Sequence, residues 1–305
     1  MSPGGRADAA RLRRVIAQIE AKNASLEAAR TPRAPIAPAF DFALGGGLEG
    51  DGLNEIVPAE PQDGPAATAF ALALAARFLD RRPGLALVIG EAFASLESGA
   101  LYGPGLLAHG LQLRRLLFVS APDDAAAFWA IEESLKSGAP AAVMGEIWSL
   151  RRYGLMASRR LLIAARRGGT PALLVLAGAY GQAEKLSTAA ATRFEIAAAP
   201  SAKIPAAAGR DLPGPFACRA RLVKARTTGA ATVAAVADRG GGLSEAALQS
   251  ERDGAVSDRA LRAHDPTRAV RLEWRNEERS FDDPAMSLAL AAAARDRSRT
   301  AAQGR

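Results

Sequence analysis

The segment best suited to chemistry is residues 54–67, where a strand, a loop and the start of a helix follow one another. A phosphate-binding loop of the form G-x-x-x-x-G-K-[ST] would lie at this place. Such a loop uses backbone N–H groups, a lysine that reaches the β- and γ-phosphates, and a hydroxyl that binds Mg²⁺. After Gly64 this chain carries Pro65 and Ala66. Because proline lacks an N–H and alanine offers no metal ligand, the residues predict that phosphoryl transfer is lost.

Two acidic side chains, Glu60 and Asp63, lie in the same loop and would repel phosphate. A helix N-terminus attracts anions, so residual nucleotide binding through Asp63, Gly64 and the helix start is one interpretation. The interpretation that we favour is a structural remnant. We therefore expect no catalytic residue, no cofactor and no metal site.

Arginines gather in the segment 151–167. Arg151 and Arg152 precede an expected helix, and Arg159 and Arg160 lie on it at exposed positions. Clustered arginines bind nucleic-acid phosphates in a salt-sensitive manner that is independent of sequence. These four residues are candidate DNA contacts, and the alternative is a solvated face or a surface for a protein partner.

Two further features suggest contact with a partner. Residues 8–30 predict a charged helix whose narrow apolar stripe consists of Leu12, Ile16, Ile19 and Leu26. A helix of this kind docks on its own domain or on a neighbouring subunit. Trp274 stands in a stretch of mixed charge much further along the chain and is a second candidate docking residue.

The elements that must position these residues alternate between strands and helices. Apolar runs predict strands at 53–57, 85–89, 116–120, 141–147 and 171–177, with helices at 66–82, 101–110, 123–137 and 155–167 between them. Asp123 is well placed as the N-cap of its helix. This alternation predicts an α/β fold with a mainly parallel sheet that helices cover on both faces.

The later part of the chain changes character. Segments 193–197, 217–226 and 231–237 predict strands of an antiparallel extension. Beyond them periodicity fades, and the composition predicts a largely disordered tail. The expected organisation is thus an N-terminal helix and linker at 1–38, an α/β core at 39–240 and a tail at 241–305.

Composition excludes several classes of site. Cys218 is the single cysteine, and His109 and His264 are the only histidines of the 305 residues, which argues against a disulfide framework, a zinc site or a Ser-His-Asp triad. The net charge of +7 suits nucleic acid or an acidic partner, and it equally suits a merely arginine-rich composition. With no apolar run of the roughly 20 residues that a membrane span requires and no signal sequence, a cytoplasmic protein is expected.

The order of elements resembles the core of the RecA and RadA ATPases. Within that superfamily the chain resembles the ImuA family, the RecA-like, SulA-related proteins of bacterial damage-inducible mutagenesis operons. The resemblance covers roughly residues 40–237 and rests on the order and spacing of several segments. These are residues 44–56, 66–76, 101–106, 113–119, 129–135, 142–146, 157–161 and 218–226.

The resemblance implies a non-catalytic scaffold or regulator of a translesion-synthesis mutasome. Its partners would be ImuB, an error-prone polymerase α subunit and the RecA filament, with association with the nucleoid after DNA damage. In RecA-type ATPases one acidic residue positions the attacking water and another holds Mg²⁺. Glu91 stands near the first position, and Gly145 or Glu146 stands at the second. We interpret Glu91 and Glu146 as vestigial, with a shared cation as the alternative.

Two other functions remain open at this stage. One is a DNA-dependent ATPase, which the missing lysine and hydroxyl argue against. The other is a SulA-like inhibitor of cell division, which needs no nucleotide site.

Overall fold

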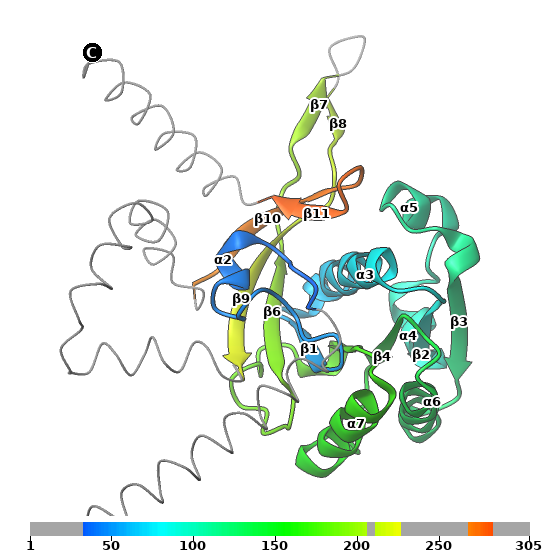
Figure 1. The fold of residues 1–305 in the computed structure, drawn as a ribbon. Coiled ribbons are helices and arrows are strands. Elements are labelled where there is room, and N and C mark those ends of the chain that lie inside the picture. The colour runs from blue at the N-terminus through cyan, green and yellow to red at the C-terminus, as the bar shows by residue number, and fades with distance from the viewer. Residues whose placement is uncertain (1–32, 206–210, 227–267, 283–305) are drawn as a thin grey trace, which may run out of the picture. The chain divides into compact units, whose positions relative to one another are not determined.

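A nine-stranded sheet organises the part of the chain that the computed structural model describes, namely residues 33–205, 211–226 and 268–282. The strand order is β11-β10-β9-β6-β1-β5-β4-β2-β3 (Figure 1). The strands are β1 (Leu53–Pro58), β2 (Ala86–Glu91), β3 (Leu116–Ala121), β4 (Ala142–Ile147), β5 (Ala172–Leu176), β6 (Thr192–Ala198), β9 (Ala217–Ala225), β10 (Val270–Arg275) and β11 (Ser280–Asp282). A separate two-stranded hairpin consists of β7 (Lys203–Pro205) and β8 (Asp211–Pro213).

The six strands from β3 to β6 are parallel, and the remaining strands join antiparallel beyond β6. The expected mainly parallel α/β sheet with an antiparallel extension is therefore confirmed. The strand expected at 193–197 is an exception, because it pairs parallel with β1 as β6 and the extension begins only at β9. Strands β1 and β5 are buried along their whole length, which explains why they lack polar–apolar alternation. The carboxyl ends of the parallel strands meet at one edge of the sheet, where ligands bind in open α/β folds.

Helices cover both faces of this sheet. Helix α3 (Gly64–Arg81) packs on one face, whereas α6 (Asp124–Ser137) and α7 (Leu155–Gly168) lie side by side on the other (Figure 1). Asp123 is the N-cap of α6, as expected, since its Oδ1 accepts the Ala126 N–H at 2.8 Å. Shorter helical elements are α2 (Pro38–Asp41), α4 (Ala92–Ser98), α5 (Gly103–Ala108) and the 3₁₀ turns η1 (Pro61–Asp63), η2 (Leu113–Arg115) and η3 (Ala177–Ala179).

The expected tail boundary at residue 241 is wrong for residues 270–282, because β10 and β11 extend the core sheet. Trp274 is accordingly no docking residue: its side chain is completely buried. Its indole N–H donates to the His109 carbonyl at 3.0 Å, and its rings stack on the His109 imidazole. Burial lowers the pKa of His109 to about 4, so the ring stays neutral and Nε2 can donate to the Ala69 carbonyl.

The expected boundary at residue 38 is also displaced, because the compact unit begins at Arg33. Ala34 and Ile36 are buried in the core, and Ala34 forms an isolated bridge with Leu48. The Arg33 guanidinium donates to the carbonyls of Leu44 and Gly47. The segment that we expected to be a linker is therefore fastened to the domain.

Some expectations fall outside the described residues. The apolar stripe of Leu12, Ile16, Ile19 and Leu26 lies there, as does the expected strand at 231–237. Among the residues that the structure describes, no helix combines the length and apolarity that a membrane crossing requires.

A close helix contact gives a test of this packing. A Cβ on Gly168, the last residue of α7, would clash with the backbone carbonyl oxygen of Leu135 on α6. Since backbone cannot yield as a side chain can, we expect Gly168→Ala to lower the free energy of unfolding by about 2–3 kcal/mol in urea titrations. Gly64→Ala is the matched control, because no atom lies within 4 Å of the position that its added methyl group would take. An equal loss in both variants would contradict this packing.

Candidate functional site

The loop between β1 and α3, where a nucleotide would be held, is fixed in place by the side chain of Asp63. Asp63 is buried, and its Oδ2 accepts the Glu60 N–H at 3.1 Å within the η1 turn. Its Oδ1 accepts the Ala198 N–H, at the end of β6, at 2.8 Å. The carboxylate thus acts as a brace between the loop and the neighbouring strand. Two backbone donors near the expected phosphate position are already satisfied.

The residues that follow offer little to phosphate. Gly64 is helical, and Pro65 and Ala66 open α3 without a lysine or hydroxyl side chain. Glu60 is exposed on the same loop, and the Asp63 carboxylate stands beside it. Two carboxylates at a helix start oppose the attraction that its N–H groups exert on anions.

Glu91, the first of the two acidic residues singled out in the sequence, has a structural role. It is buried at the end of β2, and its Oε1 accepts the N–H groups of Trp148 at 2.9 Å and Ser149 at 3.2 Å. Glu91 therefore ties the end of β2 to the segment after β4. Both hydrogen bonds end on the same carboxylate oxygen.

At the second acidic position the residue is glycine, and the side chains around it are closely packed. A Cβ on Gly145 would lie 2.5 Å from Ile131 Cδ1 and 2.9 Å from Leu174 Cδ2, so an aspartate there would require both side chains to shift. Glu146 points to the opposite, α3 side of the sheet, where burial raises its pKa. Within the described ranges, no group of three or more His, Cys, Asp or Glu side chains could hold a metal ion.

An apolar cleft of about 400 Å³ opens on this α3 side, at the carboxyl ends of β2, β3 and β4. Glu146 is the charged residue among the described side chains that line it. The cleft is lined by Pro65, Thr68, Ala69, Leu72, Val88, Gly90, Ala94, Gly99, Ala100, Leu101, Tyr102, Phe118, Val119, Ser120 and Glu146. A volume of this size is typical of pockets that hold a small molecule or a bulky peptide side chain.

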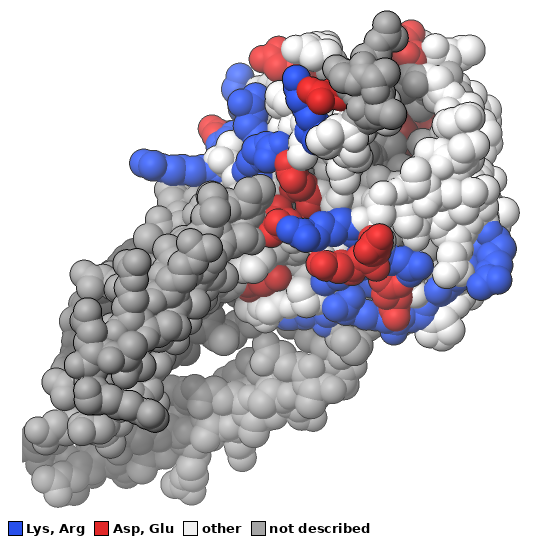
Figure 2. Space-filling view, turned by 90° about the horizontal axis from the view of Figure 1, so that it is seen from above, with Lys and Arg blue, Asp and Glu red and all other residues white. Residues whose placement is uncertain are grey.

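Exposed apolar side chains lie in the cleft lining and on the adjoining helix α4, and we call this surface the apolar face. It comprises Phe93, Leu96, Leu101, Tyr102 and Phe118, which are between 37% and 82% exposed. Figure 2 shows a broad uncharged surface on the side of the molecule where α5 and β3 lie in Figure 1. No described strand pairs with the outer edge of β3. Contiguous apolar surface next to an open strand edge is typical of protein-binding sites.

The expected DNA-contact arginines are exposed, and two of them already have partners. Arg152 pairs with Asp124 at 3.1 Å, and Arg160 pairs with Glu132 at 2.5 Å, so both are held against α6. Arg151 and Arg159 make no ion pair with another described residue. The four arginines therefore share the α6–α7 face, which is opposite to the face that carries the apolar cleft.

A buried ion pair was not anticipated from the sequence. Glu55 on β1 and Arg193 on β6 are almost completely buried, and Arg193 Nε donates to Glu55 Oε2 at 2.6 Å. Tyr153 donates its hydroxyl to the other Glu55 oxygen. Burial, and then the neighbouring carboxylate, raise the pKa of Tyr153 well above its ordinary value, so the phenol keeps its proton. The sequence feature that could have indicated this pair is Glu55, a glutamate within the apolar run that forms β1.

The comparisons with known proteins bear on this arrangement. No family model matches the chain. A curated relative, "Protein ImuA" from Caulobacter vibrioides strain NA1000 / CB15N, is 32% identical over 177 residues, which span 55% of this chain and 69% of the relative. The protein of the same name from strain ATCC 19089 / CIP 103742 / CB 15 matches to the same extent. The chain belongs to the ImuA family.

Among solved structures, this ImuA-family chain matches the crystal structure of SulA from Pseudomonas aeruginosa. The TM-score is 0.33 at 21% identity, over 41% of this chain and 96% of the other. A likeness of that size supports no conclusion about function. The family resemblance expected from the sequence is confirmed by the relatives alone.

The buried ion pair predicts a large stability effect in this ImuA-family domain. Arg193→Met should lower the free energy of unfolding by about 3–5 kcal/mol, because it leaves Glu55 charged and unpaired in the interior. The double variant Glu55→Gln/Arg193→Met should recover part of this loss in urea titrations. Arg221→Met is the control: its ion pair with Glu195 is partly exposed and should contribute less than about 1 kcal/mol. Equal losses at Arg193 and Arg221 would contradict the structural account.

The loop geometry predicts that restoring the missing side chains does not restore nucleotide binding. We expect Pro65→Lys/Ala66→Thr to show no MgATP binding by calorimetry at millimolar nucleotide, because Asp63 stays braced at the loop and Gly145 still offers no carboxylate. The unaltered protein is the reference. DNA-stimulated phosphate release that Glu91→Gln or Glu146→Gln abolishes would instead support an ATPase.

Proposed function

We propose that this protein is a non-catalytic, RecA-like scaffold or regulator of a translesion-synthesis mutasome in damage-induced mutagenesis. It would act by docking to ImuB, and through ImuB to the error-prone polymerase α subunit, or by engaging a RecA filament. The observation that carries the proposal is the contrast at the carboxyl ends of the strands. The nucleotide position is braced by internal hydrogen bonds, whereas the adjacent cleft is open and apolar.

Loss of the nucleotide switch favours a static role. Phosphoryl transfer depends almost entirely on positioning and charge neutralisation, and neither the lysine nor the metal carboxylate is present. A RecA-like domain without this cycle is suited to hold partners together or to end a filament, since it cannot change state with hydrolysis.

The apolar face supplies the docking surface in this proposal. Leu96 is 82% exposed and Tyr102 is 72% exposed, and burying two such side chains on a partner removes a large apolar area from water. Tyrosine and other aromatic residues are enriched among the residues that dominate binding energy at interfaces. We place ImuB on this face, with the RecA filament as the other occupant to be tested.

A binding experiment with matched surface variants tests the proposal. We expect Leu96→Asp/Tyr102→Asp to weaken ImuB binding at least tenfold in calorimetry or pulldown, because charge at the centre of an apolar interface must be desolvated. Leu212→Asp, on the separate β7–β8 hairpin, is the control, since Leu212 is also an exposed apolar residue. Both variants should unfold at the same temperature as the unaltered protein.

A chain that lacks residues 1–32 separates docking through the expected N-terminal helix from docking through the core. The truncation stops at residue 32 because Ala34 and Ile36 belong to the core. Loss of ImuB or RecA binding on truncation would assign the contact to that segment. If neither partner binds the full chain at micromolar concentration, the scaffold proposal fails. Filamentous cells on overexpression would then favour the division-inhibitor alternative.

A further inference from the structure

The α6–α7 face carries a second groove, far from the apolar cleft. Two ion pairs join α6 to its neighbours here: Asp124 pairs with Arg152, just before α7, and Glu132 pairs with Arg160 on α7. Between them lies a groove of about 270 Å³, which is lined by Ala125, Phe128, Trp129, Glu132, Arg152, Ala157, Arg160 and Leu161. The groove thus combines aromatic surface with guanidinium groups.

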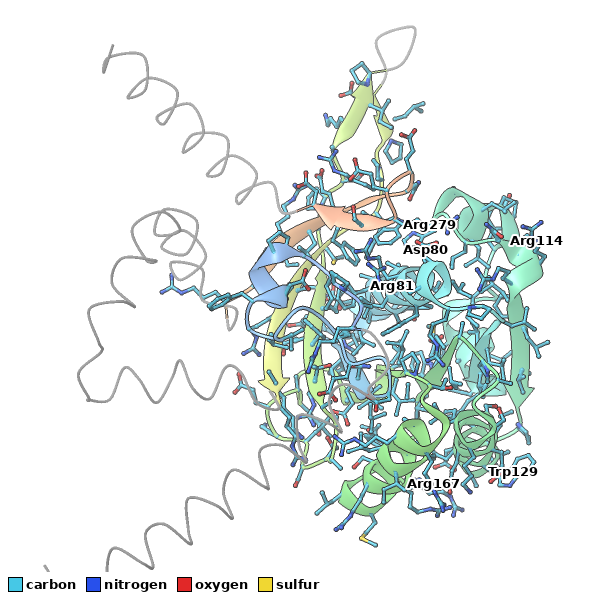
Figure 3. The ribbon with its side chains drawn as sticks, viewed as in Figure 1. Asp80, Arg81, Arg114, Trp129, Arg167 and Arg279 are labelled. Atoms are coloured by element: carbon cyan, nitrogen blue, oxygen red, sulfur yellow. The ribbon has the colours of Figure 1, made fainter. Side chains whose placement is uncertain are left out.

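Trp129 is the unusual member of this groove. Its side chain is 68% exposed, whereas Trp274 is fully buried. Large aromatic residues are normally kept from water unless they have a partner. Figure 3 shows Trp129 on α6 and Arg167 on α7 at the outer side of this helical layer, away from the sheet. Met156, 75% exposed on α7, adds apolar surface to the same layer.

Basic residues outnumber acidic ones on this layer. The segment 148–168 carries six arginines and no carboxylate, while α6 and its N-cap carry four carboxylates and one lysine. Lys136, Arg152 and Arg160 form ion pairs with these carboxylates. Arg159, Arg166 and Arg167 are exposed and make no ion pair with another described residue. Each paired guanidinium also retains N–H donors beyond the one used, because arginine has five.

We propose that the α6–α7 face binds single-stranded nucleic acid, with one base stacked on Trp129 and the phosphates bound by the surrounding arginines. A positive groove that carries an exposed aromatic is the combination that recognises unpaired strands without sequence preference. A duplex keeps its base faces stacked, so it would use the arginines but not the indole. This site is independent of the scaffold function proposed above, which uses the opposite face.

Fluorescence anisotropy of a labelled oligothymidylate with the full chain tests the proposal. We expect Trp129→Ala to weaken binding about tenfold and Trp129→Phe to weaken it less, because phenylalanine still stacks. Arg159→Gln/Arg166→Gln should lower the slope of log K against log salt by about 1.4, which corresponds to two lost phosphate contacts. The oligonucleotide should quench indole fluorescence in the unaltered protein. This quenching should be absent in Trp129→Phe.

Controls come from exposed residues of the same types elsewhere on the domain. Phe42→Ala, just after α2, and Arg114→Gln on η2, which lies away from Trp129 in Figure 3, should bind as the unaltered protein does. Equal affinity of Trp129→Ala and the unaltered protein would overturn the proposal. Equal binding of a duplex of the same length would also overturn it. Displacement of the oligonucleotide by polyglutamate at equal charge would overturn it too, and would indicate that the face binds an acidic protein segment.

Discussion

The buried pairing of Glu55 with Arg193 is the constraint around which this domain is arranged. A guanidinium removed from water must satisfy its donors inside the protein. Arg193 does so by reaching Glu55 on β1, the carbonyls of Ala183 and Leu186, and the Thr188 hydroxyl. Tyr153 brings the segment before α7 to the same carboxylate. One ion pair therefore fixes the central strands and both long connections that follow β4 and β5.

Three positions at the carboxyl ends of the parallel strands have structural roles in this domain. Asp63 braces the loop to β6, Glu91 ties β2 to the segment after β4, and Gly145 makes room for Ile131. Two of them join backbone donors of distant segments to a carboxylate, and the third lets a helix pack close to β4. Contacts within the chain therefore hold this edge of the sheet together.

Local patterns in the sequence were enough for most of the sheet, because buried parallel strands are short apolar runs between helices. They also located Asp123 as a helix cap. Local patterns cannot predict contacts between distant segments. Glu55 and Arg193 are 138 residues apart, and nothing in the sequence around either residue indicates that they meet. The strand β10 was overlooked although Val270, Leu272 and Trp274 alternate with charged residues, because the surrounding composition suggested a tail. The hydrogen bond from the Ala198 N–H to Asp63 could not be predicted either, because Ala198 lies on β6, far from Asp63 in the sequence.

The hairpin of β10 and β11 has a consequence for how the chain matures. It seals α3 through Trp274 and Phe281 and through the ion pair of Arg279 with Asp80, yet β10 begins 45 positions after β9 ends at Ala225. During synthesis these residues follow every other strand of the sheet, so the side of Phe70 that faces Phe281 lacks its partner until the hairpin has been made, although Phe194 on β6 packs on the same ring. Apolar surface that is exposed at this stage is a risk for aggregation, because domains fold as their segments are synthesised.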